Sequence, residues 1–537
     1  MSDPKASPFF MPQTQTSKAS HRVPQAFSLR TAAAAHDASV PAPAQIDNGD
    51  EARYSDKCGT YTKCLRQSGF GVVDPSAYAS FRAALDSGHP AGFNEIILGG
   101  TRTLNGPQGG LAFDLQCLDV SQFAVPPAPA LAGEEYAAEL TELYWASLLR
   151  DVAFANYSSN ALAQQASSEL SFLSSYQGPR DATGKVTPDL LFRGPFAGET
   201  DGPYLSQFLL KSTCIGAMPV TQKYTTFQAN VDYVVTPNDF LKVQNGIATG
   251  QTLQPQDPVY LHNGRGLAAF THNDVLYQAY LTAYLVLNSL NGASCATGDN
   301  PAKLNPGNPY VPKNPHGEWK TQNGFTTFGQ PDIASTLAAV ASEALKAVWF
   351  QKWFVHLRHR PESGGGIVHL SKTGQQDSVE GKLSPTVLNS QAVQTSFNKF
   401  GTYFLTQAFP EGSPAHPAYP TGHGAVAGAC ITVLKFFYDG AQTVPNPQVP
   451  PDGGSGLSSY SGPPLTVNGE LHKLATNISF GHGIHAGIHW RSDTVTSIDL
   501  GEAVALSVLH DRARTYNEKF TVHLTKLDGT VATISNE

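Results

Sequence analysis

Three short segments of the chain place charged and imidazole side chains beside a break in regular structure. The first contains two cations, Lys352 and Arg360, and Arg360 is followed by Pro361. The residue before a proline is pushed out of the helical region, so a helix ends here and both cations lie near its C-terminal end. Cations at that position either bind an anion or simply complement the negative end of the helix dipole.

The second segment begins at His416 and predicts the start of a helix. Thr421 and Gly422 follow Pro420, and His423 falls in the first helical turn. Free backbone N–H groups in the first turn bind oxyanions, and glycine lets the anion approach closely. Thr421 also fits an ordinary N-cap, but His423 has no part in capping.

The third segment contains His489 and Asp493, four residues apart. At this spacing the carboxylate can hold one imidazole nitrogen and leave the other free. The same spacing is common among His–Asp pairs on protein surfaces. Cations, a helix N-terminus and an oriented imidazole together predict an oxyanion pocket with a nucleophilic or metal-ligating histidine.

This order of motifs resembles the signature of the acid phosphatase and vanadium-dependent haloperoxidase superfamily: Lys and Arg-Pro, then Pro-Ser-Gly-His, then Arg-x5-His-x3-Asp. The form is similar to that of algal and cyanobacterial bromoperoxidases, in which seven residues separate the lysine and the arginine, as they do Lys352 and Arg360. Those enzymes also have a histidine where His416 precedes His423 by seven positions. Other segments look alike: 142–151, 191–196, 202–210, 326–329 and 349–362. The resemblance covers about residues 55–515.

The resemblance implies a vanadate cofactor and a role for each motif residue. His489 corresponds to the histidine that bonds to vanadium. The groups that correspond to holders of the cofactor's oxygens are Lys352, Arg360, Thr421, the Gly422 amide, His423 and His482. His423 is implied as the acid–base histidine and Lys352 as the cation that polarises peroxide. His416 would tune proton traffic and halide choice, and Asp493 would orient His489.

Two positions depart from the pattern. Thr421 replaces serine, which keeps the hydroxyl, and the arginine of the third motif is absent. Counting six residues back from His489 gives Gly483, whereas one inserted residue gives His482. Arg491 follows His489 by two residues and is a poor substitute. Losing a buried guanidinium costs on the order of 1.5–3 kcal/mol, so we predict weakened vanadate retention.

The activity implied is oxidation of bromide, with chloride and iodide as further candidates, by hydrogen peroxide to hypohalous acid, which halogenates small organic acceptors. One alternative is a phosphomonoesterase with His489 as phosphoryl acceptor. Another is a weakened relative that binds oxyanions or forms a shell. His416 and the resemblance outside the pocket favour the peroxidase. Because relatives form dimers or dodecamers, we expect a homo-oligomer.

The elements that must position these residues are mostly helices. Apolar periodicity predicts helices at Glu134–Tyr157, Val275–Leu290, Ser335–His356, Thr421–Tyr438 and Asp499–Arg514. A hairpin pairs Phe520–Thr525 with Thr530–Ile534, and long loops span 294–331, 361–380 and 440–468. The fold class is mainly α: a helical bundle of the haloperoxidase and acid phosphatase type with long loops and a few short β-hairpins. We predict that residues 1–52 form an arm that is disordered or loosely draped over the protein. Residues 53–537 form one large domain, with the pocket built from 340–515.

Composition limits the kinds of partner and the cellular locations that we expect. The formal net charge is −8 and basic residues form no long run, which argues against nucleic acid or a membrane surface as partner. No signal-peptide core is evident, so a cytoplasmic location is the default and the true location is unknown. Six cysteines do not form a framework, although Cys58 and Cys64 are close enough to pair. Whether the segment from Phe328 to Asp332 helps to bind calcium is left open.

Overall fold

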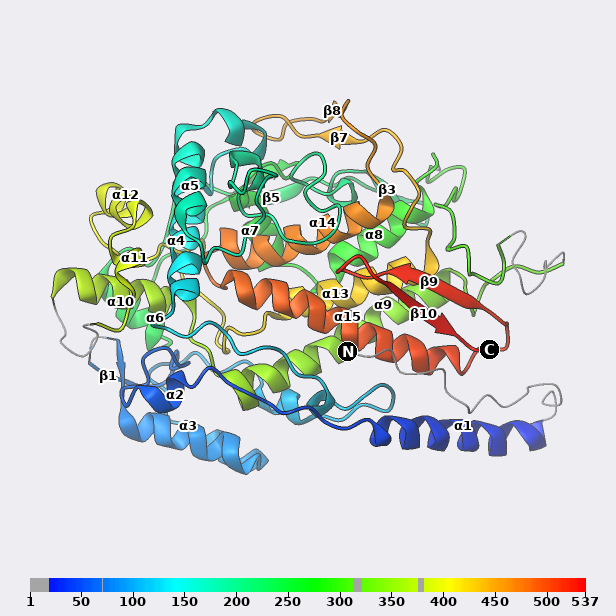
Figure 1. Cartoon of the computed structure of the whole chain (residues 1–537), viewed down its shortest axis with the longest axis horizontal. Helices are drawn as coiled ribbons and strands as arrows, with labels where there is room; N and C mark the ends of the chain where they lie inside the picture. The colour runs from blue at the N-terminus through cyan, green and yellow to red at the C-terminus, as the bar shows by residue number, and fades with distance from the viewer. Residues whose placement is uncertain (1–18, 70, 293, 312–320, 375–380) are drawn as a thin grey trace.

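The computed structural model describes residues 19–69, 71–292, 294–311, 321–374 and 381–537, which build a mainly helical protein (Figure 1). Four long helices run through its centre: α9 (Gln330–Phe350), α13 (Gly422–Phe437), α14 (Val467–Phe480) and α15 (Arg491–Ala513). Helix α13 is buried along its whole length and contacts the other three. A Cβ added at Gly428 would lie 1.9 Å from the Ile498 carbonyl oxygen. Only glycine therefore allows α13 and α15 to approach so closely.

A second group of helices surrounds α4 (Glu134–Leu149), which stands across the central helices in Figure 1. It comprises α5 (Ala161–Phe172), α10 (Pro361–Thr373), α11 (Pro385–Leu388) and α12 (Gln391–Phe400). The remaining α-helices are α1 (Ala19–Ser39), α2 (Asp50–Arg53), α3 (Pro75–Ser87), α6 (Pro237–Gln244), α7 (Gly264–His272) and α8 (Gln278–Asn288). Helix α4 is buried from Tyr136 to Leu149, so it forms the core of this second layer.

Strands are short and form only two-stranded antiparallel pairs within the described residues. The pairs are β1 (Gln67–Gly69) with β2 (Val72–Val73), β3 (Thr213–Ile215) with β4 (Met218–Val220), β5 (Tyr224–Phe227) with β6 (Pro255–Val259), β7 (Gln448–Val449) with β8 (Ser458–Ser459), and β9 (Thr521–Thr525) with β10 (Val531–Ser535). The pair β9–β10 is the predicted terminal hairpin. The predicted fold class, mainly α with a few short hairpins, is confirmed.

The five predicted helices are present, with shifted ends. Helix α4 ends at Leu149 rather than at Tyr157, and α15 begins at Arg491 rather than at Asp499. The earlier start has a local cause: the Asp493 carboxylate accepts a hydrogen bond from the Trp490 amide and caps the first turn. The predicted loop at 361–380 is wrong over its first part, because α10 occupies Pro361–Thr373. Proline at the first helical position starts a helix as readily as it ends the preceding one.

The predicted N-terminal arm of residues 1–52 contains a helix, α1, in its described part. The alanine run at 32–35 favours helix, and α1 lies along one edge of the protein (Figure 1). The C-terminal end of α1 is attached to the body. The Gln122 side-chain amide donates to the carbonyl oxygens of Asp37, at 2.7 Å, and of Val40, at 2.6 Å. Asp37 also shares a side-chain hydrogen bond with Asp511.

This carboxyl pair predicts that attachment of α1 depends on pH. Burial, followed by the charge of Asp511, raises the pKa of Asp37 from 3.8 to about 6. The attached state therefore prefers protonated Asp37. This stabilisation is complete below the pKa of the detached helix and is lost as pH rises through about 6. We expect protection of the α1 amides from hydrogen exchange, corrected for intrinsic rates, to fall several-fold between about pH 5 and about pH 7. Asp37→Asn should make the protection independent of pH, and an unchanged pH dependence in that variant would contradict the assignment.

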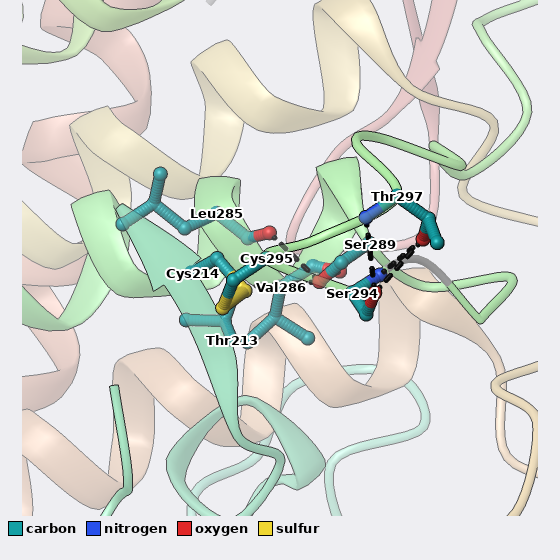
Figure 2. Close-up of a disulfide and its surroundings, with 8 residues drawn as sticks. All are labelled: Thr213, Cys214, Leu285, Val286, Ser289, Ser294, Cys295 and Thr297. Carbon is teal, nitrogen blue, oxygen red and sulfur yellow. Dashed lines mark hydrogen bonds between the residues drawn. A yellow bond between two sulfur atoms is a disulfide. The ribbon is translucent and has the colours of Figure 1, made fainter. Parts of the chain in front are cut away.

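The one disulfide within the described residues joins Cys214 to Cys295, across 81 residues of sequence (Figure 2). It ties β3 to the segment that follows α8. Beside it, the Thr213 and Ser289 hydroxyls lie 3.2 Å apart. Cys58 and Cys64 are both free thiols, so the pairing considered from their closeness in sequence is wrong. Neighbours in sequence need Cβ atoms that face each other to form a disulfide, and separation along the chain does not report this.

One segment of the described chain, Gln330–His356, is long and apolar enough to cross a membrane. It comprises α9 and the turn that follows it. Half of its most apolar window is buried inside the protein. Because α9 packs against α13 and α15, the apolar character is that of a core helix.

Candidate active site

Lys352 lies in a π-helical turn, Gln351–His356, that continues α9. The turn ends at Leu357, whose left-handed φ of 45° breaks the helix. The Lys352 side chain is completely buried, and its Nζ donates to the carbonyl oxygens of Pro417 and Ala418, both at 2.8 Å. Burial, with a further contribution from Arg360, holds the pKa of Lys352 well below its ordinary value. Lys352 thus joins the first motif to the second.

Arg360 connects all three motifs. Its guanidinium donates to the carbonyl oxygens of His416, at 2.8 Å, and Ile488, at 2.9 Å, and Nη1 lies 2.7 Å from His489 Nε2. Burial lowers the pKa of Arg360 to about 10, so the group stays charged at neutral pH. Arg360 is also the N-cap residue of α10, where the helix dipole is positive. These acceptors all lie outside α9, so the bonds of Arg360 join the motifs and do not serve the C-terminal end of that helix.

His489 and Asp493 form a completely buried pair rather than a surface pair. His489 Nδ1 lies 2.9 Å from Asp493 Oδ2, and Asp493 Oδ1 accepts from Arg358 at 2.8 Å. An ionised carboxylate only accepts hydrogen bonds, so Nδ1 carries the proton and Nε2 carries the lone pair. The carboxylate thus holds one imidazole nitrogen, the contact that the four-residue spacing predicted, and the Nε2 lone pair faces the Arg360 guanidinium.

Thr421 occupies the N-cap position of α13 but does not cap the helix with its side chain. Its hydroxyl is buried and has no hydrogen-bond partner among the described residues. Gly424 in the same turn admits a close neighbour, because a Cβ there would lie 1.9 Å from Ser497 Oγ, whereas a Cβ at Gly422 would make only ordinary contact with the Trp349 ring at 3.4 Å. Because buried hydroxyls normally have a partner, the orphan hydroxyl favours an oxyanion ligand over the capping role.

His482 and His423 stack on each other, with ring centroids 3.7 Å apart and an interplanar angle of 24°. The His482 ring also lies 5.5 Å from the His489 ring, and His482 Nδ1 is buried without a described partner. Gly483 has no room for a side chain, because a Cβ there would lie 2.8 Å from Thr494 Cγ2 and 3.0 Å from His489 Cβ. Of the two positions considered for the missing arginine, His482 is the one whose side chain meets the pocket histidines.

The structure does not bring Arg491 to the site. Its guanidinium pairs with the Glu142 carboxylate and donates to the Arg193 carbonyl oxygen at 2.8 Å. Glu142 and Arg491 are both buried, so this pair joins α4 to the start of α15. The sequence-based doubt about Arg491 as a substitute donor agrees with this arrangement.

His416 lies at the side of the pocket, against Trp349. Their ring centroids are 4.8 Å apart, and the His416 and His489 rings are 6.4 Å apart. Burial first, and the Arg360 charge second, hold the pKa values of His416 and His489 well below their ordinary range. For His482, burial and then the neighbouring His423 lower the pKa in the same direction. These three imidazoles are therefore neutral at neutral pH.

Two charged residues that support the site were not predicted. Asp274, between α7 and α8, lies 3.1 Å from His423 Nε2. Arg358 bridges Asp493 and Glu139, at 2.8 Å each, and so fixes the carboxylate that orients His489. Arg358 lies between Lys352 and Arg360 in the first motif, which was the available signal. Asp274 belongs to no motif in the sequence, so no sequence pattern pointed to it.

A buried ion pair also holds the turn that leads to His416. Lys63 pairs with Glu362 and donates to the carbonyl oxygens of Glu411, at 3.0 Å, and Ser413, at 2.6 Å. Glu362 in turn accepts from the Ser413 amide at 2.7 Å. Lys63 lies far from these partners in sequence, so no pattern pointed to it.

The residues present fit a tetrahedral oxyanion bonded to one imidazole. Two cations, an orphan hydroxyl, the start of α13 and the lone pair of His489 Nε2 converge in a buried place. Vanadate needs only one such protein ligand. No group of three or more His, Cys, Asp or Glu side chains in the described chain is arranged to hold a metal ion. In the segment from Phe328 to Asp332, the Asp332 carboxylate accepts from the Phe328 amide at 2.9 Å and the Tyr516 hydroxyl at 2.7 Å.

Comparisons with known proteins agree with this geometry. Residues 333–518 match the family model of the VCPO second helical-bundle domain. A vanadium-dependent bromoperoxidase of Ascophyllum nodosum is 32% identical, with 94% of this chain and 91% of that protein aligned. One of Corallina pilulifera is 30% identical over 96% of this chain and 98% of that protein. The solved homohexameric second vanadate-dependent bromoperoxidase of A. nodosum superposes with a TM-score of 0.88 at 27% identity, covering 99% of this chain and 94% of that one. The chain therefore belongs to the vanadium-dependent bromoperoxidases, a family of enzymes.

Proposed function

We propose that this enzyme binds vanadate and uses hydrogen peroxide to oxidise bromide to hypobromous acid, which then halogenates small organic acceptors. The observation that carries the proposal is the buried His489 imidazole. Its Nδ1 is fixed by Asp493, and its Nε2 faces Arg360. The Thr421 amide donates to the Asp493 carbonyl oxygen at 3.1 Å, so the start of α13 lies next to this pair. A single oriented imidazole within a cationic pocket is the donor set that vanadate requires.

His489 Nε2 would hold the vanadium atom. Lys352, Arg360, Thr421, the Gly422 amide and His482 would donate to its oxygens. Bound vanadate supplies a Lewis acid that polarises peroxide towards attack by halide. An anion beside Lys352 opposes the two causes that lower its pKa, burial and the Arg360 charge, and so favours the charged ammonium.

His423 is placed to move a proton. Its Nε2 faces the Asp274 carboxylate, and its ring lies against His482. We assign to His423 the acceptance of a proton from incoming peroxide, with Asp274 stabilising the imidazolium that forms. Asp493 and Arg358 act as positioning residues through His489. His416, beside Trp349, flanks the pocket where it can influence halide choice.

One paired assay tests the proposal. The purified protein is reconstituted with vanadate, and bromination of a dye is measured with peroxide and bromide. Hydrolysis of p-nitrophenyl phosphate is measured without vanadate. We expect bromination that depends on vanadate and little phosphate hydrolysis. Hydrolysis without bromination would instead assign the pocket to a phosphomonoesterase, and inactivity in both assays would point to an oxyanion-binding relative.

Removing the Thr421 hydroxyl should weaken vanadate binding moderately. Thr421→Val keeps the shape of the side chain and removes one hydrogen bond to an anion. We expect the dissociation constant for vanadate, from calorimetric titration, to rise by up to about ten-fold, which corresponds to about 1.4 kcal/mol. Thr432→Val is the matched control, because Thr432 is buried in the same helix and donates only to the Gly428 carbonyl oxygen. Equal effects of the two variants would show that Thr421 acts through the fold of α13.

The solved neighbour is a homohexamer, and we propose that this chain also assembles as a homo-oligomer. The Cys214–Cys295 disulfide favours an oxidising compartment over the cytoplasmic default, because cytosolic thiols are kept reduced.

A further inference from the structure

Helix α14 carries two buried hydroxyls that make no bond within their own helix. Thr476 is 1% exposed and Ser479 is completely buried, and neither side-chain oxygen has a hydrogen-bond partner among the described residues. In the neighbouring helix α13, by contrast, the buried Thr432 hydroxyl donates to the Gly428 carbonyl oxygen at 2.8 Å. A buried hydroxyl that does not bond to its own helix needs another partner, and ordered water is the usual one.

A buried carboxyl lies next to the first of these hydroxyls. Glu199 is completely buried, and neither of its carboxyl oxygens makes a regular hydrogen bond with a described residue. Gly194 joins it to α14, because the Gly194 amide faces the Glu199 carboxyl and a Cβ added at Gly194 would lie 2.7 Å from Thr476 Oγ1. Ala197 and Asp201, two residues to either side of Glu199, are exposed, so this carboxyl lies close beneath the surface.

Helix α14 and the π-helical turn after it carry this series of polar atoms to the candidate active site. Ser479 follows Thr476 by three residues, and His482 follows Ser479 by three. A Cβ added at Gly424 would lie 2.9 Å from Ser479 Oγ, so Ser479 lies beside the residue that follows His423. His482 stacks on His423, and His482 Nδ1 is a further buried atom without a described partner. We call these residues the polar row: Glu199, Thr476, Ser479 and His482.

The spacing within the polar row matches that of single bridging waters. Side chains three residues apart on a helix have Cβ atoms about 5–6 Å apart, which is twice a hydrogen-bond length of about 2.8 Å. One water between two such groups completes a hydrogen bond to each of them, and a buried water typically makes about three hydrogen bonds. Hydroxyls and waters both donate and accept, so a chain of them can pass a proton from one end to the other.

The surroundings of Glu199 leave its carboxyl without an ion-pair partner. Three cations and a neutral phenol face it: Arg193, Lys473, Arg491 and Tyr204. The Arg193 guanidinium donates to three backbone carbonyl oxygens, and the other two cations each pair with a different carboxylate. Burial therefore dominates and raises the pKa of Glu199 from 4.5 to about 7, against the opposing charge of Arg193. Such a carboxyl holds a proton near neutral pH and can still release it.

The proposed reaction consumes one proton in every turnover. Bromide, hydrogen peroxide and a proton give hypobromous acid and water: the O–O bond breaks as the Br–O bond forms, and the departing oxygen takes up the proton. We propose that the polar row delivers this proton from Glu199 to the stacked pair of His482 and His423, and that solvent then protonates Glu199 again. The proposal rests on the proposed bromoperoxidase function and extends it to the supply of the proton.

Glu199→Gln tests the source of the proton, because the amide fills the same space and cannot release one. We expect kcat for dye bromination at about pH 7 to fall by about ten-fold or more. The loss should shrink towards lower pH, as protons from bulk solvent become more abundant, and the solvent deuterium isotope effect on kcat should rise. KM for peroxide and bromide and the dissociation constant for vanadate should stay unchanged, since Glu199 lies outside the pocket.

Glu343→Gln is the matched control for this variant. Glu343 on α9 is 6% exposed, has one carboxyl oxygen without a described partner, and has a pKa raised by burial to about 7. It lies outside the polar row, so its replacement should leave kcat unchanged. Equal kcat values for the wild-type protein and Glu199→Gln, or equal losses in the two variants, would overturn the proposal.

Thr476→Val interrupts the polar row and leaves Glu199 in place. It should lower kcat to the same extent as Glu199→Gln, and the double variant should be no slower than either single variant, because both changes block one path. Thr476→Ser keeps the hydroxyl and should retain the wild-type rate, as should the control Thr432→Val. A double variant whose loss is the product of the two single losses would contradict a shared path.

A readout that needs no turnover is the infrared band of the protonated Glu199 carboxyl in vanadate-free protein. We expect a band that disappears as pH rises through about 7 and that is missing from Glu199→Gln. Ordered water beside Thr476 and Ser479 is expected in a high-resolution crystal structure. An inactive wild-type protein would contradict the proposed function, whereas a dry polar row, or the lack of a titrating Glu199 band, in an active protein would overturn this proposal alone.

Discussion

Replacing His489 with alanine is expected to abolish vanadate-dependent bromination at every vanadate concentration. His489 Nε2 is the one lone pair that the pocket offers to vanadium in our assignment, because Nδ1 is occupied by Asp493. No other histidine of the site has its carboxylate partner at Nδ1 and its Nε2 directed at a cation. Lys352, Arg360, Thr421 and the Gly422 amide are assigned to donate to the cofactor's oxygens, and His423 is assigned to proton transfer. The measurements are the bromination rate across a vanadate titration and vanadate binding by calorimetry.

The control for this variant is His369→Ala. His369 is also buried, but it lies on α10 and stacks on Phe404, away from the three motifs. It should retain bromination within a few-fold and bind vanadate normally. Bromination that survives in His489→Ala but is lost in His423→Ala would show that His489 is not the vanadium ligand. Loss of bromination in both His489→Ala and His369→Ala would indicate damage to the fold.

Replacing His482 with arginine is expected to tighten vanadate binding by about ten- to a hundred-fold, which corresponds to about 1.4–2.8 kcal/mol. Burial and the adjacent His423 keep the pKa of His482 low. The neutral ring therefore donates at most one hydrogen bond. A guanidinium keeps its charge and offers several donors in a fixed plane. The readout is the dissociation constant for vanadate, with bromination as a second measurement.

Gly483→Arg provides the contrast. A Cβ there would lie 2.8 Å from Thr494 Cγ2 and 3.0 Å from His489 Cβ. That variant should therefore weaken vanadate binding by displacing His489. Tightening by Gly483→Arg and not by His482→Arg would show that the arginine of the family belongs at residue 483.

The sequence was informative wherever a pattern repeats within one element. The apolar period of residues 335–356 and 421–438 located α9 and α13, since a buried helix needs apolar residues at that spacing. Helix α10 was missed because Pro361 reads equally as a helix stop and as a first helical residue. The Cys214–Cys295 pair was missed because 81 residues separate the two thiols and no local pattern records that contact.

The candidate site divides in the same way. Lys352, Arg360, Thr421, His423 and His489 were found because each lies in a short motif, and the structure brings these motifs together. The sequence left three alternatives open: cations that complement a helix dipole, Thr421 as an ordinary N-cap, and His489 with Asp493 as a surface pair. Each alternative is decided by the exposure or the hydrogen bonds of a side chain. Only the structure reports that Thr421 Oγ1 is an orphan and that Asp493 is buried. Asp274 and Lys63 act across long sequence separations, so a single sequence gave no sign of them.

The two π-helical turns have a consequence for how residue spacings in this chain are interpreted. Lys352 lies in the turn Gln351–His356, and His482 lies in the turn Gly481–His485. A π turn accommodates one more residue than an α turn over the same rise, and such turns are frequent at functional sites. At both places the number of residues along the chain therefore does not give the position of a side chain in space. For this reason His482 and Gly483 were both candidates for the position of the missing arginine. An insertion absorbed in this way changes which side chain faces the oxyanion while leaving His489 in place. A search that requires a fixed spacing before this histidine will miss any chain in which such a turn contains an extra residue.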